Sequence, residues 1–343
     1  MNKKKIVFGF LVAVVVGVVG ISLVANVFLA PNIFTKTKDT EYFLLIPENT
    51  TFDELVAELT ENTRVKKINT FKQTARVLKF KTVRSGRYRI VNSMNNMTLV
   101  KMLRNGNQTP VQLTFNNIRT KEQLSSRLSQ QLMPDSFQIL DLLNDSAFLS
   151  QYGVTPETSV SLFLPNTYEM FWNVKAEKIF ERMYKEYEKF WTDERKQKAA
   201  AIPLTQSQVS TLASIVDSET NSRAEKPIVA GLYINRLKRN MPLQADPTVI
   251  FALGDFTIKR VLNVHTQIES PYNTYRNTGL PPGPIRIPSL TGLDAVLDYD
   301  RNDYIFMCAK ETLNGEHNFA STWAEHQKNA AKYQKALNER GIR

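Results

Sequence analysis

A glutamate in the C-terminal half of the chain, Glu219, has the setting of a catalytic acid. The segment Thr205-Gln206-Ser207-Gln208 is a capping box, which predicts that a helix starts there. Glu219 shares one face of that helix with three apolar residues, Val209, Leu212 and Val216. Burial on such a face raises the pKa of a carboxyl, as a general acid at neutral pH requires. A structural ion pair with Arg223 or Arg236 explains the same periodicity equally well.

Two neighbouring acids have simpler explanations. Asp217 is only two residues from Glu219 and therefore points elsewhere on the helix, where we expect a solvated surface charge. Glu225 closes a second capping box, Ser222-Arg223-Ala224-Glu225, ahead of a helix with Pro227 in its first turn. We therefore expect Glu225 to cap that helix, which leaves Glu219 as the candidate acid.

Two loops beyond this helix carry side chains suited to sugars. The first contains Pro242 and Pro247, and the second leads into the proline- and glycine-rich segment 279–285. Proline fixes φ and glycine permits tight bends, so we expect both loops to be rigid, as long ordered loops that serve a site are. Their polar groups suit sugar hydroxyls and amides, and their tyrosines offer flat faces to pyranose rings: Gln244, Asp246, Thr248, Tyr272, Asn273 and Tyr275.

The other reactive residue types lack the spacing of a metal or cofactor site. His265, His317 and His326 are scattered along the chain, so we expect them to be structural and expect no metal. Cys308 is the only cysteine, which rules out an intramolecular disulfide. It lies in an apolar run over residues 304–309 that predicts a strand, where a buried structural thiol is expected rather than a nucleophile.

Five ordered blocks of the sequence resemble one known family, the membrane-bound endolytic murein transglycosylases (the MltG or YceG-like family). Two further segments, 164–168 and 315–319, resemble other signatures of that family. The order and spacing match across nearly the whole chain. The five blocks cover residues 212–220, 229–237, 243–250, 272–275 and 279–285.

The resemblance implies a function and assigns roles to residues. Members cleave the β-1,4 bond between N-acetylmuramic acid and N-acetylglucosamine within nascent glycan strands, leave 1,6-anhydro ends and end chain elongation, which implies contact with a peptidoglycan synthase complex. They are lyases without a cofactor, and their catalytic Glu precedes a Ser or Thr, as Glu219 precedes Thr220. Gln244 matches a substrate-contacting Gln, and Tyr272-Asn273 matches a Tyr-Asn pair. This chain departs from the family pattern at Asp217, where Glu is usual, and at Asn166, 116–117 and 286–289.

Two other functions remain open. A muramidase that hydrolyses the same bond would use Asp246 as a second carboxylate, because ordinary glycoside hydrolases use a pair of carboxylates. A membrane-anchored, non-catalytic scaffold that binds glycan would need no acid at all. The products formed from glycan strands distinguish the three possibilities.

The elements that must position these residues predict an α+β protein with a membrane anchor. Lys3, Lys4 and Lys5 precede an uncharged apolar run over residues 6–30, which predicts a transmembrane helix with residues 1–5 in the cytoplasm and the rest of the chain outside the inner membrane. We expect a linker over 31–40, a LysM-like module over 41–108, a connecting α/β region over 109–160 and a catalytic domain with a lysozyme-like active-site helix over 161–343. The strand–helix–helix–strand order of the module also fits a purely structural unit.

The charge of the chain agrees with this placement. Its 343 residues carry a formal net charge of +11, which attracts anionic polymers and membrane surfaces. No zinc-finger, RNP or basic-zipper signature is present, so we expect no nucleic-acid partner. Peptidoglycan strands and the lipid bilayer are the expected partners.

Overall fold

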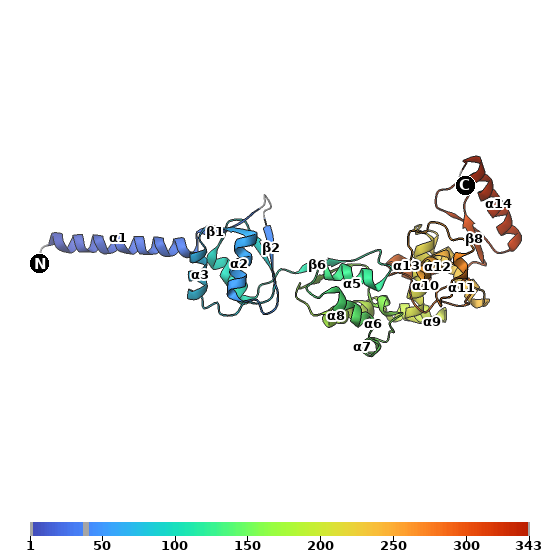
Figure 1. Cartoon of the computed structure of the whole chain (residues 1–343), viewed down its shortest axis with the longest axis horizontal. Helices are drawn as coiled ribbons and strands as arrows, with labels where there is room; N and C mark the ends of the chain where they lie inside the picture. The colour runs from blue at the N-terminus through green and yellow to red at the C-terminus, as the bar shows by residue number, and fades with distance from the viewer. Residues whose placement is uncertain (1–2, 37–40, 342–343) are drawn as a thin grey trace. The chain divides into compact units, whose positions relative to one another are not determined.

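The computed structural model describes residues 3–36 and 41–341, the first three of them by their backbone only. Helices and strands are mixed along the chain, as the α+β class predicts (Figure 1). The chain forms two compact units, and the expected boundary between residues 160 and 161 lies inside the second. The first comprises Met1–Leu113, Gln131–Met133 and Tyr168–Val174, and the second comprises Thr114–Gln130, Pro134–Thr167 and Lys175–Arg343.

The N-terminal helix is long and apolar enough to cross a membrane. α1 spans Lys3–Phe28, and its apolar part, Ile6–Phe28, has 23 residues with a mean hydropathy of 2.9. At a rise of about 1.5 Å per residue this part exceeds the roughly 30 Å of a bilayer's hydrocarbon core. Its apolar side chains are not buried by the rest of the chain, so nothing in the described protein removes them from water.

The strand, two helices and strand expected after the anchor are present, with one short strand, β3 (Thr63–Val65), between the two helices. The four expected elements are β2 (Glu41–Ile46), α2 (Phe52–Asn62), α3 (Ile68–Val77) and β4 (Gly86–Val91). β2 and β4 pair antiparallel along their whole length, from Glu41 opposite Val91 to Ile46 opposite Gly86. The inward faces of the four elements form one core, which includes Leu44, Leu55, Phe71, Tyr88 and Ile90.

The prediction of a polar linker over 31–40 is wrong for its first half. Pro31–Thr35 forms β1, which lies between β3 (Thr63–Val65) and β5 (Met94–Asn95) in a three-stranded antiparallel sheet. Asn32 falls in the predicted polar linker, but its side chain is buried and donates to Asn96 Oδ1 over 2.7 Å. The Asn96 amide in turn donates to the Val27 carbonyl over 2.8 Å and so ties the end of α1 to the sheet. The part of the expected linker at 37–40 lies outside the described residues.

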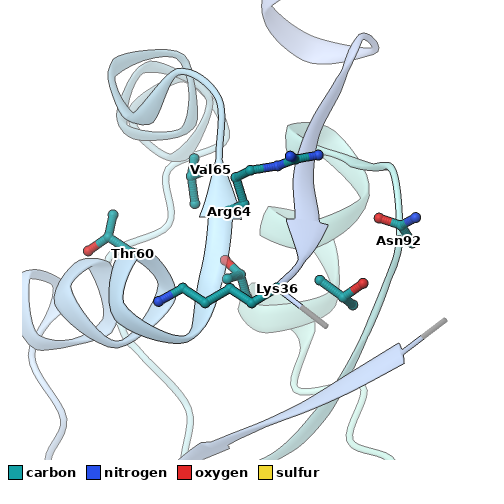
Figure 2. Close-up of a pocket in the computed structure, with 7 residues that line it drawn as sticks. Lys36, Thr60, Arg64, Val65 and Asn92 are labelled. Atoms are coloured by element: carbon teal, nitrogen blue, oxygen red, sulfur yellow. The ribbon is translucent and has the colours of Figure 1, made fainter. Parts of the chain in front are cut away.

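The remaining elements of the first unit are α4 (Asn96–Asn105) and, except for their end residues Thr114 and Thr167, β6 (Val111–Thr114) and β7 (Thr167–Met170). β6 and β7 form a two-stranded sheet. A pocket of about 630 Å³ lies beside β1 and β3 (Figure 2). Two cations, Lys36 and Arg64, and no acidic residue line it. The Lys36 amine donates to the backbone carbonyl of Glu61, which holds this side chain against the fold.

The second unit is mostly helical and has one hairpin, β8 (Phe306–Ala309) paired antiparallel with β9 (His317–Ala320). Its other elements are α5 (Lys121–Ser129), α6 (Ser136–Asn144), α7 (Ser146–Ser150), η1 (Ser159–Leu162), α8 (Ala176–Phe190), α9 (Asp193–Ala201), α10 (Gln206–Glu219), α11 (Lys226–Lys238), α12 (Asp246–Leu253), η2 (His265–Gln267), α13 (Leu290–Leu297) and α14 (Trp323–Glu339).

The centre of this unit is formed by α10, α11 and α13, each of which contacts the other two. Every residue of α10 from Val209 to Asp217 is buried. α13 packs against Asp217 of α10 at Gly292, where a Cβ atom would lie 2.5 Å from Oδ1 of Asp217. Glycine at this position therefore permits the close packing that encloses α10.

Candidate active site

The predicted helix that carries Glu219 is confirmed. Thr205 Oγ1 accepts a hydrogen bond from the Gln208 amide over 3.2 Å, and the Gln208 side chain accepts from the Thr205 amide over 2.8 Å. The helix continues from this capping box to Glu219, its last residue. Val209, Leu212 and Val216 are fully buried on the face that Glu219 shares. Glu219 is thus held at the end of a helix whose core side is completely packed.

Glu219 lines a pocket of about 290 Å³ and has an altered acidity. Tyr233, on α11, donates its hydroxyl proton to Glu219 Oε1 over 2.8 Å. Burial raises the pKa of Glu219 to about 7, and the negative charge of Asp246 also raises it, whereas the Tyr233 hydrogen bond and the Arg236 charge lower it. A carboxyl with this pKa can be protonated before a reaction and ionised after it, both near neutral pH.

The ion-pair alternative for Glu219 is not realised in the described residues. Arg236 is 8% exposed, and burial lowers the pKa of its guanidinium group. Its donors are directed to neighbouring segments and not to Glu219. The acceptors are the Ile305 carbonyl at 2.7 Å, the Leu243 carbonyl at 2.8 Å, and the Pro242 carbonyl and Gln244 Oε1, both at 3.2 Å.

Three of the predicted substrate-binding residues line the same pocket: Gln244, Asp246 and Tyr275. Gln244 has a left-handed backbone with φ of 52°, and its backbone amide donates to the Thr274 carbonyl over 3.0 Å. Asp246 begins α12, and its Oδ1 accepts a hydrogen bond of 2.5 Å from the Tyr275 hydroxyl. The two predicted loops therefore meet beside Glu219, and each contributes polar groups to one pocket.

Thr248 and Asn273 differ from the prediction, because both side chains are fully buried. Thr248 Oγ1 lies 2.7 Å from the Ala245 carbonyl oxygen and 2.8 Å from Thr274 Oγ1. The Asn273 amide donates to the carbonyls of Thr266 and Ile268 over 2.9 and 2.8 Å. Thr248 thus joins the first loop to the second through Thr274, and Asn273 fixes the second loop through residues 266 and 268.

Thr220 and Tyr272 also lie outside the lining of the pocket. Thr220 is 4% exposed, and its hydroxyl donates to Glu225 Oε2 over 3.0 Å. The ring of Tyr272 packs on Phe251 with 4.8 Å between ring centroids, and burial raises the pKa of its hydroxyl to about 12. Thr220 therefore contacts Glu225 and Tyr272 contacts α12, and neither side chain lines the pocket.

The expectation that Asp217 is a solvated charge is wrong. It is 6% exposed and pairs with Lys226 over 2.5 Å, while its Oδ2 accepts from the Ser289 amide over 2.5 Å. Asp217 does point away from the face that carries Glu219, but α11 and α13 pack against α10 and leave no solvated face at this position. Two positions that depart from the family pattern, Asp217 and Ser289, are thus in direct contact.

The expectation that Glu225 caps a helix is also wrong. α11 begins at Lys226, and the Glu225 side chain forms no capping hydrogen bond. Glu225 is buried, and its carboxylate instead binds His317, whose backbone amide donates to Oε1 over 2.7 Å. A residue 92 positions away has therefore replaced the local partner that the capping-box pattern suggested.

The pocket of Glu219 is also lined by residues that the sequence analysis predicted to be structural or did not single out. Cys308 and its neighbours Met307 and Ala309 on β8, together with His317 on β9, line the pocket. The predicted strand is confirmed, but Cys308 is only partly buried and faces the site. The family signature at 315–319 was the available signal for His317. Among the described residues, no three His, Cys, Asp or Glu side chains are grouped so as to hold a metal ion.

Comparison with known proteins accounts for nearly all of the chain. The endolytic murein transglycosylase of Bacillus subtilis is 28% identical over an alignment of 324 positions, which covers 89% of this chain and 88% of that protein. The Streptococcus pneumoniae protein of the same name is 26% identical over 84% of this chain, which spans 57% of its length. A crystal structure of a YceG-like protein from Listeria monocytogenes shares the fold, with a TM-score of 0.58 at 24% identity, over 84% of this chain and 98% of that one.

The family assignment rests on a match that extends over most of the chain and not on single motifs. The model of the YceG-like family matches residues 44–332, a range that contains most of the module after the anchor and every residue of the pocket of Glu219. The chain belongs to the YceG-like family.

Proposed function

We propose that this protein is an endolytic peptidoglycan lytic transglycosylase that cleaves the β-1,4 bond between N-acetylmuramic acid and N-acetylglucosamine inside glycan strands. The observation that carries the proposal is Glu219, an acid with a pKa of about 7 in a pocket lined by polar groups. The name of the relatives in Bacillus subtilis and Streptococcus pneumoniae supports the same reaction.

The proposed chemistry uses one carboxyl twice. Protonated Glu219 donates its proton to the glycosidic oxygen as the bond from that oxygen to C1 of the muramic acid breaks. The N-acetyl group of the same sugar stabilises the positive charge that develops at C1. Glu219, now a carboxylate, removes the proton of the C6 hydroxyl while O6 bonds to C1, which closes a 1,6-anhydro ring and restores the protonated acid. The Tyr233 hydrogen bond at 2.8 Å stabilises the intermediate carboxylate.

The contacts of the pocket divide the candidate residues into two groups. Gln244, Asp246 and Tyr275 line the pocket and are proposed to bind the sugars. Thr220, Thr248 and Asn273 are proposed to hold Glu219 and the two loops in place, because their polar groups are used inside the fold. Tyr272 is proposed to help through its ring, which packs on Phe251 of α12. α10 then plays the part of the active-site helix in lysozyme-like enzymes, with the acid at its C-terminal end.

We further propose that α1 anchors the protein as a single membrane span with its N-terminus in the cytoplasm. The 23-residue apolar segment and the lysines before it support this orientation. The first unit after the anchor is proposed to be LysM-like, on the support of its β2–α2–α3–β4 order and the antiparallel pairing of β2 with β4. A membrane-anchored transglycosylase that cleaves nascent glycan strands would end their elongation. We propose that it does so in contact with the peptidoglycan synthase complex.

The test uses the detergent-solubilised full chain and isolated peptidoglycan strands. Mass spectrometry of the wild-type digest is expected to show internal cuts with 1,6-anhydromuramic acid ends, and Glu219→Gln is expected to lose about 100- to 10,000-fold in rate. The control is Asp246→Asn. Reducing-end muramic acid together with an inactive Asp246→Asn would establish the muramidase, and strand binding without any cleavage by the wild type would establish the scaffold.

A further inference from the structure

The partner of His317 is a buried carboxylate that no lysine or arginine of the described chain neutralises at ion-pair distance. Glu225 Oε2 lies 3.1 Å from Nδ1 of the His317 ring and accepts the Thr220 hydroxyl over 3.0 Å. Its other oxygen accepts the His317 backbone amide over 2.7 Å. The side chains of His317 and Glu225 are only 17% and 10% exposed. The imidazole ring is therefore fixed at two points, through its backbone and through Nδ1.

This arrangement suits one tautomer of the ring. A carboxylate can only accept hydrogen bonds, so the tautomer that bonds to Glu225 carries its proton on Nδ1. In the neutral ring Nε2 then presents a lone pair. Within residues 3–36 and 41–341 no side chain or carbonyl forms a hydrogen bond with Nε2, and His317 lines the pocket that contains Glu219.

Most other polar groups of the pocket are already engaged. The Tyr233 hydroxyl is bound to Glu219, the Tyr275 hydroxyl to Asp246, and the Arg236 guanidinium to the chain around residues 242–244 and to the Ile305 carbonyl. A sugar that enters brings several hydroxyl donors, which need acceptors when they leave water. His317 Nε2 is an acceptor held in a fixed direction at low entropic cost, since Glu225 has already ordered the ring.

We propose that His317 is a further substrate-binding residue, whose Nε2 accepts a hydrogen bond from a hydroxyl of the glycan, with Glu225 as the residue that positions the ring. The inference rests on the proposed function for the identity of the glycan. Thr220 connects the two parts of the site, because it follows Glu219 in the chain and donates to Glu225. The hydroxyl that His317 contacts is thereby placed in a fixed relation to the catalytic acid.

Two substitutions separate substrate binding from a purely structural role. The amide of His317→Asn reaches the position of Nδ1 and can keep the bond to Glu225, but it leaves nothing at Nε2. The longer His317→Gln carries an acceptor to the position of Nε2 and leaves Nδ1 empty. Each is made in the full chain with Glu219→Gln as background, so that binding of glycan strands is measured without cleavage.

We expect His317→Asn to weaken strand binding by about 10-fold, the effect of one lost hydrogen bond with its acceptor removed, and His317→Gln to restore part of it. With Glu219 intact, the same order is expected in KM, with a smaller change in kcat. Wild-type binding in His317→Asn would overturn the proposal. So would equal weakening in both variants with a lowered unfolding temperature, because that result assigns His317 to the support of β9. A wild type that binds strands without cutting them would sink the proposed reaction and leave this binding test valid.

Discussion

The Tyr233 hydroxyl donates a 2.8 Å hydrogen bond to Oε1 of Glu219, so the catalytic candidate is held by a donor that favours its ionised form. Burial acts in the opposite direction and has the larger effect, since the pKa of Glu219 is raised to about 7. The pKa of Glu219 is thus set mainly by two opposing effects: burial at the end of α10 raises it, and the hydrogen bond from Tyr233 lowers it. Each side of this balance can be changed separately.

The rate of strand cleavage should fall as the pH rises through about 7, because only protonated Glu219 can donate to the glycosidic oxygen. Tyr233→Phe removes the hydrogen bond that lowers the pKa of Glu219, so the alkaline limb of kcat/KM should move to higher pH. The pH profile of kcat/KM for the two proteins checks this. A limb that stays in place, or moves to lower pH, would show that another group controls it.

Asp246→Asn should move the same limb in the other direction. The negative charge of Asp246 raises the pKa of Glu219, so its removal makes Glu219 ionise at lower pH. The asparagine can still accept from Tyr275, whose hydroxyl lies 2.5 Å from Oδ1. Below the limb, the rate should therefore fall much less than in Glu219→Gln. A loss as large as that of Glu219→Gln at every pH would instead make Asp246 part of the chemistry.

Lys226→Met should destabilise the second unit by about 3–5 kcal/mol, because it leaves the charge of Asp217 buried without its cation. The side chains of this pair are 10% and 4% exposed. The matched control is Lys178→Met, which breaks a pair whose side chains are 61% and 42% exposed and should cost less than about 1 kcal/mol. Urea denaturation of the full chain in detergent measures both. Equal effects in the two variants would contradict the buried pair.

Alkylation of Cys308 should block cleavage, since this side chain lines the pocket of Glu219. Burial raises the pKa of the thiol, and the thiolate is the reactive form, so the reaction with iodoacetamide should be slow at neutral pH and faster in alkali. Cys308→Ala should stay active and resist the reagent, and Cys308 is the only cysteine to react. An alkylated protein with full activity would place Cys308 outside the site, and an inactive Cys308→Ala would give the thiol a role in the reaction.

Local patterns were sufficient wherever the physical cause is local. The capping box of Thr205 and the spacing of Val209, Leu212 and Val216 predicted α10 and the inward face of Glu219, because both depend on hydrogen bonds and side-chain directions within one helix. The uncharged run over residues 6–30 predicted the apolar helix for the same reason. The order of β2, α2, α3 and β4 also follows from periodicity within each segment.

Contacts between distant segments decided the rest. Asp217 became a buried ion-pair partner because α11 and α13 cover the face of α10 that periodicity leaves to solvent. Glu225 bonds to His317, 92 residues away, instead of capping its own helix as the local pattern predicted. Through this bond His317 is held in the lining of the pocket. Sequence alone therefore determined which helix carries the acid and which side of it faces inward. Only the tertiary structure decided what surrounds that acid. The charges and the hydrogen-bond donor that set its pKa come from other segments, and no local sequence pattern predicts that these segments pack together.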